Sequence, residues 1–276
     1  MPMNWSALEQ AVAAAEAEAT VGVAVVAPGG EAWSHNGRQK FKAASTVKIP
    51  IMIRIFRQIE AGELALDDVY TLGRADKTPG SGVLLHMHSG IQVTLGDLLY
   101  LMMSISDNTA TNYLIDLAGM EEVNSVMQAI GMTDSVLARK MAGREADNPL
   151  LENWATALDY ARSITALLEG TAASQASCDA MLAILEKQQN NRRIGRHAPA
   201  GEGYRWGSKT GSLDGVCNDV GFITTPQGTL AIAVFTEAIP DQITGERIIA
   251  DITKAALEAT GLAGSETTGQ AAARMS

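Results

Sequence analysis

Segments with the pattern of β-strands occur only at the two ends of the chain, and helix-like segments fill most of the sequence between them. Residues 20–27 (TVGVAVVA) and 31–35 predict a hairpin joined by a Pro-Gly-Gly turn. Strands so far apart in sequence can form one sheet only if the chain returns to that sheet, and this condition excludes most simple topologies. The other predicted strands form an antiparallel meander near the end of the chain: residues 204–210, 216–225 and 230–237.

The predicted helices flank or interrupt this sheet. A first helix begins at Asn4 or Ser6 and runs to Ala19, and the last one spans residues 246–259. Residues 47–60 are apolar on nearly every side, which is typical of a buried helix. Five more helices are predicted: residues 94–104 (capped by Thr94), 108–118, 121–130, 155–168 and 174–188. Residues 67–93 and 139–153 are predicted loops.

This order of elements predicts the fold class. We expect an α/β (α+β) protein with a five-stranded antiparallel sheet, flanked by the N- and C-terminal helices, and an inserted all-helical lobe. Residues 1–42 and 190–276 are assigned to the sheet domain and residues 43–189 to the helical domain. A ligand-binding cleft is expected where the two meet. Residues 262–276 are expected to be a frayed tail.

Charge and composition narrow the range of partners. A net charge of −10 argues against nucleic acid or an anionic membrane surface, although lysines inside a cleft can still attract an anionic small molecule. No stretch approaches the roughly 20 apolar residues of a membrane-spanning helix. The first residues lack the basic start and apolar centre of a secretory signal. We therefore expect a cytoplasmic location as numbered, and a periplasmic or secreted one if a signal was removed.

Several residues that could suggest other chemistry have simpler interpretations. Cys178 and Cys217 are expected to be small buried side chains, with a disulfide between them as the alternative. His86 and His88 have no zinc-type spacing and are interpreted as a loop pair, so no metal or cofactor is expected. Three arginines are expected to face solvent rather than bind substrate: Arg192, Arg193 and Arg196.

Three short motifs carry the chemistry, and the first is Ser45-Thr-Val-Lys48. Ser45 and Lys48 lie three residues apart at a helix start, so their side chains share one face. The helix dipole there favours a developing negative charge near Ser45. Burial of Lys48 near a second lysine would lower its pKa and make its neutral amine available as a base.

The other two motifs supply complementary groups. Ser106 can pass a proton to a leaving nitrogen, Asn108 can hold a substrate amide, and Asp107 is expected to cap a helix. The third motif, at the edge of the sheet, offers a positive charge for a carboxylate, a hydroxyl donor and a close backbone approach, from Lys209, Thr210 and Gly211 respectively.

With these motifs in this order and spacing, the chain resembles the serine β-lactamase and penicillin-binding superfamily over about residues 20–259. The middle motif Ser-Asp-Asn favours class A over class C, which would show Tyr-x-Asn, and class D, which would show Ser-x-Val. The resemblance implies acylation of Ser45 by an activated amide, with the N–H groups of Ser45 and Ser212 as oxyanion hole. It implies a small substrate, carrying a carboxylate, of the β-lactam, ester or peptide-like kind.

One loop departs from the family pattern. Class A enzymes carry Glu-x-x-Leu-Asn in a loop whose glutamate activates water for release of the acyl group, and residues 139–153 contain no such run. Glu145 with Asn148, or Glu152 with Asn153, are the candidates to replace it, and a solvated loop acid is the alternative for Glu145. We therefore expect a β-lactam hydrolase. The alternatives are a related serine esterase, amidase or D-Ala-D-Ala-type peptidase and, more remotely, a non-catalytic penicillin sensor.

Overall fold

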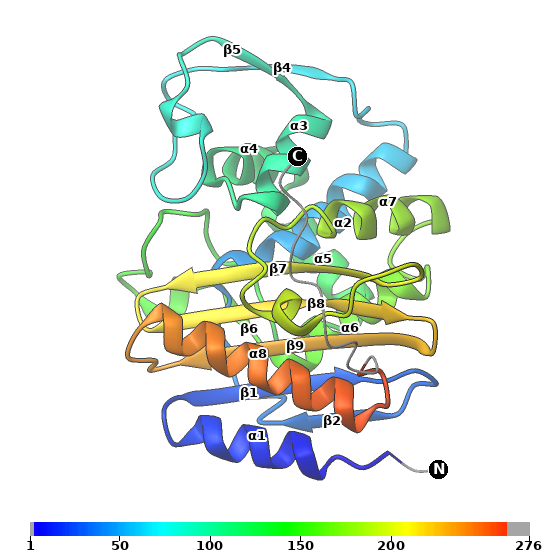
Figure 1. Cartoon of the computed structure of the whole chain (residues 1–276). Helices are drawn as coiled ribbons and strands as arrows, with labels where there is room; N and C mark the ends of the chain where they lie inside the picture. Colours follow the sequence, from blue (N-terminus) through cyan, green and yellow to red (C-terminus); the bar gives the residue numbers. More distant parts are fainter. Residues whose placement is uncertain (1–2, 264–276) are drawn as a thin grey trace.

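A five-stranded antiparallel sheet forms the centre of the computed structural model, which describes residues 3–263 (Figure 1). Its strand order is β2-β1-β9-β8-β7, so the predicted return of the chain to one sheet is confirmed. Within β1, Val23 pairs with His35 on one side and with Val234 on the other. The strands are β1 (Thr20–Val26), β2 (Ala32–His35), β7 (Arg205–Leu213), β8 (Val216–Thr225) and β9 (Gly228–Glu237).

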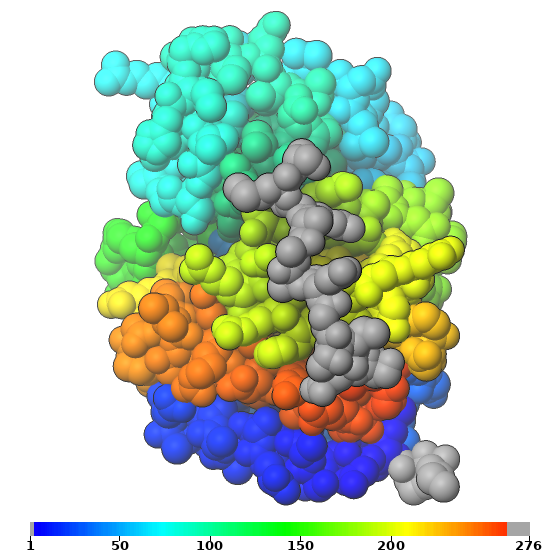
Figure 2. Space-filling view, viewed as in Figure 1, coloured from blue at the N-terminus to red at the C-terminus, as the bar shows by residue number. Residues whose placement is uncertain are grey.

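Two terminal helices, α1 (Ser6–Glu16) and α8 (Gln242–Ala259), cover one face of this sheet. Figure 2 shows them in blue and orange on the same face of the molecule. Their apolar sides pack onto β1 and β9, because alternate strand residues such as Val21 and Val23 point to this face. The helix α8 begins four residues earlier than predicted, since the Asp241 side chain accepts a hydrogen bond from the Thr244 N–H and caps it.

The helical lobe lies against the other face and extends beyond the β7 edge (Figure 1). Its central helix α2 (Lys48–Glu60) is buried along nearly its whole length, as its all-round apolar sequence predicts. The remaining helices are α3 (Leu95–Ser104), α4 (Asn108–Ala118), α5 (Met120–Ala129), α6 (Ala157–Leu168) and α7 (Gln175–Leu185).

The helix α6 joins this lobe to the sheet. It packs on β1, β8 and β9, and its Tyr160 meets Phe235 edge to face with ring centroids 5.4 Å apart. The largest hydrophobic cluster therefore contains residues of the sheet, such as Ala24, together with residues of the lobe, such as Leu98. The assignment of residues 43–189 to a separate domain thus remains an interpretation of the chain order.

Four short strands in the structure were not predicted from the sequence. The strands β4 (Val69–Leu72) and β5 (Ile91–Thr94) pair within the region 67–93, and β3 (Phe41–Lys42) pairs with β6 (Trp154–Ala155). These segments of two to four residues are too short to show a clear alternation. The cap predicted at Thr94 is confirmed, since Thr94 and Asp97 exchange the two hydrogen bonds of a capping box.

Smaller predictions have mixed outcomes. Cys178 and Cys217 are both buried and free, as expected of small apolar side chains. Leu262, assigned to the frayed tail, is instead buried against the terminal helices, while residues 264–276 lie outside the described part of the chain. Within residues 3–263, none of the helices has the length and apolar character needed to cross a bilayer.

Candidate active site

Ser45 lies in the single turn η1 (Ala44–Val47), which leads directly into α2. It is 8% exposed, so only a small part of its side chain is accessible. Two of the neighbouring residues have a backbone conformation that is unfavourable for side chains: Ala44 with φ +47° and Ser106 with φ +61°. Backbone strain of this kind persists only where the surrounding structure holds it. Here the strained residues are Ala44, which precedes Ser45, and Ser106, which belongs to the second motif.

Lys48 connects the first motif to the second. Its side chain is completely buried, and Nζ donates to the Ser106 carbonyl oxygen at 2.8 Å, to Ser106 Oγ at 2.9 Å and to Asn108 Oδ1 at 3.0 Å. Burial first, and then the charge of Lys209, hold the pKa of Lys48 well below its ordinary value, with partial opposition from Asp107. The direction agrees with the sequence-based expectation.

Asp107 has the structural role predicted for it. Its Oδ1 accepts a hydrogen bond from the Ala110 N–H at 3.0 Å and so caps α4. Its Oδ2 accepts from the N–H groups of Val83 and Leu84 and fixes the preceding loop. Gly82 is required at this contact, because it has φ +112° and a Cβ there would lie 2.2 Å from Asp107 Oδ2.

The third motif lies on β7, the edge strand next to η1. Lys209 is completely buried, and burial lowers its pKa to about 7, with Asp219 opposing this shift and Arg193 adding to it. Gly211 contacts the turn that carries the serine: a Cβ there would lie 3.0 Å from the Ala43 carbonyl oxygen and 3.2 Å from the Ser45 nitrogen. This close approach brings the backbone of β7 alongside Ser45, as expected for glycine at this position.

Arg193 was wrongly assigned to the solvent-exposed surface. It is 3% exposed, and its guanidinium donates to the carbonyl oxygens of Gly211 at 3.0 Å and Asn218 at 2.7 Å, and to Ser212 Oγ at 2.7 Å. Its charge also lowers the pKa of the buried Asp219, although burial outweighs this effect and the pKa stays raised. The arginine thus joins the last residue of the third motif and the residue after it to the neighbouring strand β8.

The sequence indicates only indirectly that one of these arginines is buried. Asp219 lies in the otherwise apolar run of β8, and a buried carboxylate needs a cation or several donors. Nothing in the basic run itself distinguishes Arg193 from its neighbours. Arg192 and Arg196 are exposed, as predicted.

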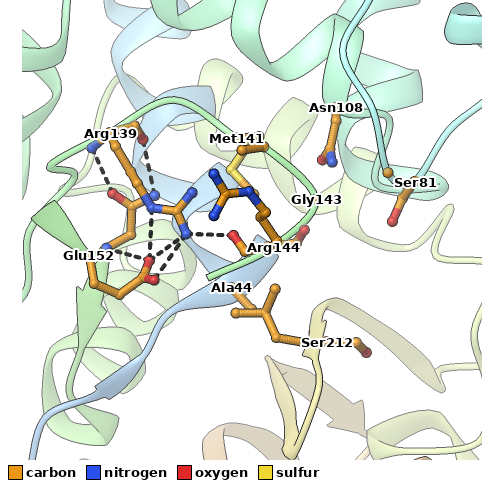
Figure 3. Close-up of a pocket in the computed structure, with 14 residues that line it drawn as sticks. Ala44, Ser81, Asn108, Arg139, Met141, Gly143, Arg144, Glu152 and Ser212 are labelled. Carbon is orange, nitrogen blue, oxygen red and sulfur yellow. Dashed lines mark hydrogen bonds and ion pairs between the residues drawn. The ribbon is translucent and has the colours of Figure 1, made fainter. Parts of the chain in front are cut away.

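Ser45 lies on the wall of a cavity (Figure 3). Its walls come from three parts of the chain: Ser81 and Asn108 in the helical lobe, Ser212 at the end of β7, and the loop of residues 139–153. Ser106 and Thr210 line a second, more open hollow with the segment of residues 188–192. The three motifs therefore meet where the lobe and the sheet adjoin, as the sequence predicted.

The loop of residues 139–153 is closed by a buried ion pair (Figure 3). The Arg139 guanidinium binds both carboxylate oxygens of Glu152, with distances between 2.9 and 3.1 Å, and Glu152 is 4% exposed. Asn153 Oδ1 accepts from the Arg139 N–H, and its own carbonyl oxygen accepts from the Ala43 N–H at 2.7 Å. The end of the loop is thus tied to the chain two residues before Ser45.

Glu145 and Asn148 have other partners. Glu145 Oε1 lies 2.7 Å from Lys42 Nζ, and the residue lines a separate depression formed by the loop itself. The Asn148 side chain accepts from the Leu150 N–H and caps the short turn η3 (Pro149–Leu151). The structure therefore does not bring Glu145 to the wall of the Ser45 cavity, where Met141 is found instead.

The sequence model of the β-lactamase enzyme family matches residues 5–260. The chain belongs to this family. A β-lactamase of Rhodobacter capsulatus is 35% identical over 137 residues, which cover 48% of this chain and 46% of that protein. The aligned part thus spans about half the length of this relative.

Solved structures extend the β-lactamase likeness to the whole fold. The crystal structure of a β-lactamase from Sphaerobacter thermophilus is 64% identical and covers 95% of this chain and 98% of that one, with a TM-score of 0.92. PBP-A is 25% identical, with 92% and 96% covered and a TM-score of 0.81. A mutant of PBP-A is known as an acyl-enzyme complex with penicillin G. Class A β-lactamases share the same fold, which confirms the predicted resemblance.

Proposed function

We propose that this chain is a serine β-lactamase, which opens the β-lactam amide through an acyl-enzyme on Ser45. The observation that carries the proposal is the position of Lys48. Its buried amine starts the helix that follows Ser45, its pKa is lowered, and it lies 2.9 Å from the hydroxyl of Ser106. A base three residues from the nucleophile, with a proton carrier hydrogen-bonded to that base, supplies groups that acyl transfer from an amide requires.

In the proposed acylation, the neutral Lys48 Nζ accepts the proton of Ser45 while Oγ forms a bond to the carbonyl carbon. The carbon–nitrogen bond of the lactam then breaks, and Ser106 Oγ donates its proton to the leaving nitrogen. Lys48 returns a proton to Ser106 across the 2.9 Å hydrogen bond. Each proton is thereby accounted for, and Lys48 is neutral again at the end of the step.

The remaining motif residues are proposed to bind the substrate. The N–H groups of Ser45 and Ser212 would hold the developing oxyanion, which the approach of Gly211 to the Ser45 nitrogen supports. Lys209 and Thr210 would bind a carboxylate of the substrate, and Asn108 an amide of its side chain. Positive charge buried beside the cavity, from Lys209 and Arg193, favours an anionic substrate in a protein whose net charge is −10.

The test combines hydrolysis of a chromogenic cephalosporin with intact-mass measurement after addition of benzylpenicillin. We expect hydrolysis and a covalent adduct in the wild type, and neither in Ser45→Ala or Lys48→Ala. Lys40→Ala, which changes an exposed lysine close in sequence, is the matched control and should retain both. Absence of both signals in the wild type would overturn the proposal. Turnover of short-chain esters that depends on Ser45, without β-lactam turnover, would make the chain a related esterase.

A further inference from the structure

We infer that Asn218 is a positioning residue for the nucleophile, because its side chain holds the two peptide groups in front of the strained Ala44 and so fixes the orientation of Ser45. The inference rests on the proposed function, since it adds a residue to the same reaction. Asn218 lies on β8, outside the three motifs, and it is completely buried. It does not line the cavity of Ser45, so its influence on the reaction passes through the residues that it holds.

The Asn218 side chain reaches from the sheet to β3. Successive residues of a strand point to opposite faces, and Val220 belongs to the hydrophobic cluster that includes the helical lobe, so Asn218 points toward the lobe as well. Its Nδ2 donates to the carbonyl oxygens of Lys42 at 2.9 Å and Ala43 at 3.4 Å. Its Oδ1 accepts from the Thr236 N–H at 3.1 Å. A polar side chain thus takes a position where the alternation of β8 predicts an apolar one, and both of its polar atoms bind main-chain groups.

Residues 42 and 43 are held at each of their main-chain hydrogen-bonding atoms. Their two N–H groups donate to Glu237 Oε1 at 2.6 Å and to the Asn153 carbonyl oxygen at 2.7 Å, respectively. Their two carbonyl oxygens accept from Asn218, and the second one also accepts from the Thr46 hydroxyl at 2.7 Å. The chain therefore reaches the residue before the nucleophile from a fixed direction.

Ala44 depends on this support, because a φ of +47° is unfavourable for a residue that carries a Cβ. Without the hydrogen bonds from Asn218, the preceding peptide groups can shift and Ala44 can relax toward negative φ. Rotation about this bond turns Ser45, with its N–H, relative to β7. Asn218 also pairs with Gly211, the residue before Ser212, so it relates the two N–H groups of the proposed oxyanion hole to each other.

This placement predicts a specific defect when the hydrogen bonds of Asn218 are lost. Ala44 and Ser212 both line the cavity of Ser45 (Figure 3), so a shift of the turn changes the place where the oxyanion forms. The oxyanion exists only in the tetrahedral state, and loss of one donor to it costs about 10²–10³-fold in kcat. Binding of the intact substrate depends on other contacts, so KM should change little.

The first experiment compares the wild type with Asn218→Leu, which keeps a similar volume and removes the hydrogen-bonding groups. Hydrolysis of a chromogenic cephalosporin should show kcat lowered about 100-fold and KM changed by less than about 3-fold. Phenylboronic acid provides a readout of the oxyanion hole. Ser45 Oγ bonds to boron, the serine proton passes to Lys48, and the tetrahedral adduct places an oxygen in the hole. Its affinity should fall about 10–100-fold.

A matched pair of threonine variants separates positioning from stability. Thr46→Val removes the hydroxyl bond to the Ala43 carbonyl oxygen with little change in volume, and it should lower kcat and boronate affinity together, by less than Asn218→Leu does. Thr253→Val removes a buried hydroxyl bond of the same kind within α8, where the acceptor is the Ile249 carbonyl oxygen at 2.8 Å. This control should lower the urea midpoint and leave boronate affinity unchanged.

Ala44→Gly tests the role of the strain. Glycine adopts positive φ without a steric penalty, so the turn then needs less support from the sheet. In a double-mutant cycle, Asn218→Leu should reduce kcat at least about 5-fold less in the Ala44→Gly background than in the wild type.

The inference would be overturned if folded Asn218→Leu kept its kcat and boronate affinity, if only its KM changed, or if Ala44→Gly did not lessen the loss. Where Asn218→Leu fails to fold, Thr46→Val decides: parallel losses of kcat and boronate affinity support the inference, and wild-type values contradict it. A wild type that neither hydrolyses the cephalosporin nor binds the boronate would instead contradict the proposed function.

Discussion

Arg193 shows how a single residue joins the sheet to the site. It is buried behind the third motif, where its guanidinium holds two main-chain carbonyls and the hydroxyl of Ser212. The planar guanidinium, with several donors in fixed directions, suits this arrangement better than lysine would. Its charge also adds to the lowered pKa of Lys209 and offsets the buried Asp219. Stability and the electrostatics of the site therefore depend on the same side chain.

Arg193→Ala should lower the free energy of unfolding by about 3–5 kcal/mol, because it removes the larger of the two positive charges that act on Asp219 and the donors to two buried carbonyls. Urea denaturation measures this change. Arg196→Ala, at an exposed position two residues after the buried Ile194, is the control and should shift the value by less than about 0.5 kcal/mol. Equal effects of the two substitutions would show that the buried network contributes little.

The residues of the site differ in how well the sequence revealed them. Ser45, Lys48 and Ser106 belong to short motifs whose spacing carries chemical meaning, and the structure joins Lys48 to Ser106 by a hydrogen bond. The burial of Arg193 could not be predicted, because nothing in the sequence distinguishes it from the neighbouring arginines. Met141 gave no signal either, because a methionine in a loop becomes informative only when the loop is seen to fold over the serine.

At the scale of elements, side-chain caps explain where the helices begin. Thr94, Asp107 and Ser174 each accept a hydrogen bond from the N–H three residues later, and the predicted starts of α3, α4 and α7 agree with the structure within one residue. Asp241 does the same for α8 but was overlooked. The short strands β4 and β5 escaped prediction because they are stabilised by pairing with each other rather than by burial of an apolar face.

The loop of residues 139–153 allows a direct comparison of two ion pairs. Glu152→Gln should lower the free energy of unfolding by about 3 kcal/mol, because the partly buried Arg139 guanidinium loses its buried counter-charge. Asp147→Asn removes the partner of Arg144 on the exposed side of the same loop and should leave the unfolding midpoint unchanged. Chemical denaturation of both variants checks this expectation. A similar loss in both would mean that the loop is held by its charges in general rather than by the buried pair.

In the molecule as a whole, several ionisable side chains are buried at the junction of the sheet and the helical lobe. Lys48 and Lys209 are completely buried, and both have lowered pKa values. Such groups oppose folding at neutral pH, since they are protonated in the unfolded chain and pay for desolvation in the folded one. The order of helices and strands predicted this junction correctly, but periodicity cannot show which polar residues are enclosed there.

Lys209→Met should therefore make the protein more stable at pH 7, while carboxylate binding is lost. With a pKa of about 7 in the folded state and an ordinary value of 10.5, Lys209 binds more protons when unfolded throughout the interval between these values. The stability of the wild type relative to the variant should then rise by up to about 1.4 kcal/mol per pH unit between pH 7 and 10. Denaturation curves at several pH values test this, and parallel curves for both proteins would contradict it.

The place of β1 between β2 and β9 has a consequence for biosynthesis. Val23 pairs with Val234, so the hydrogen-bonding edge of the first hairpin remains open until almost the entire chain has left the ribosome. Contacts of such long sequence separation slow folding, because a large loop must close before they form. During synthesis the nascent chain thus exposes an unpaired strand edge for a long interval, in which aggregation or capture by chaperones competes with completion of the sheet.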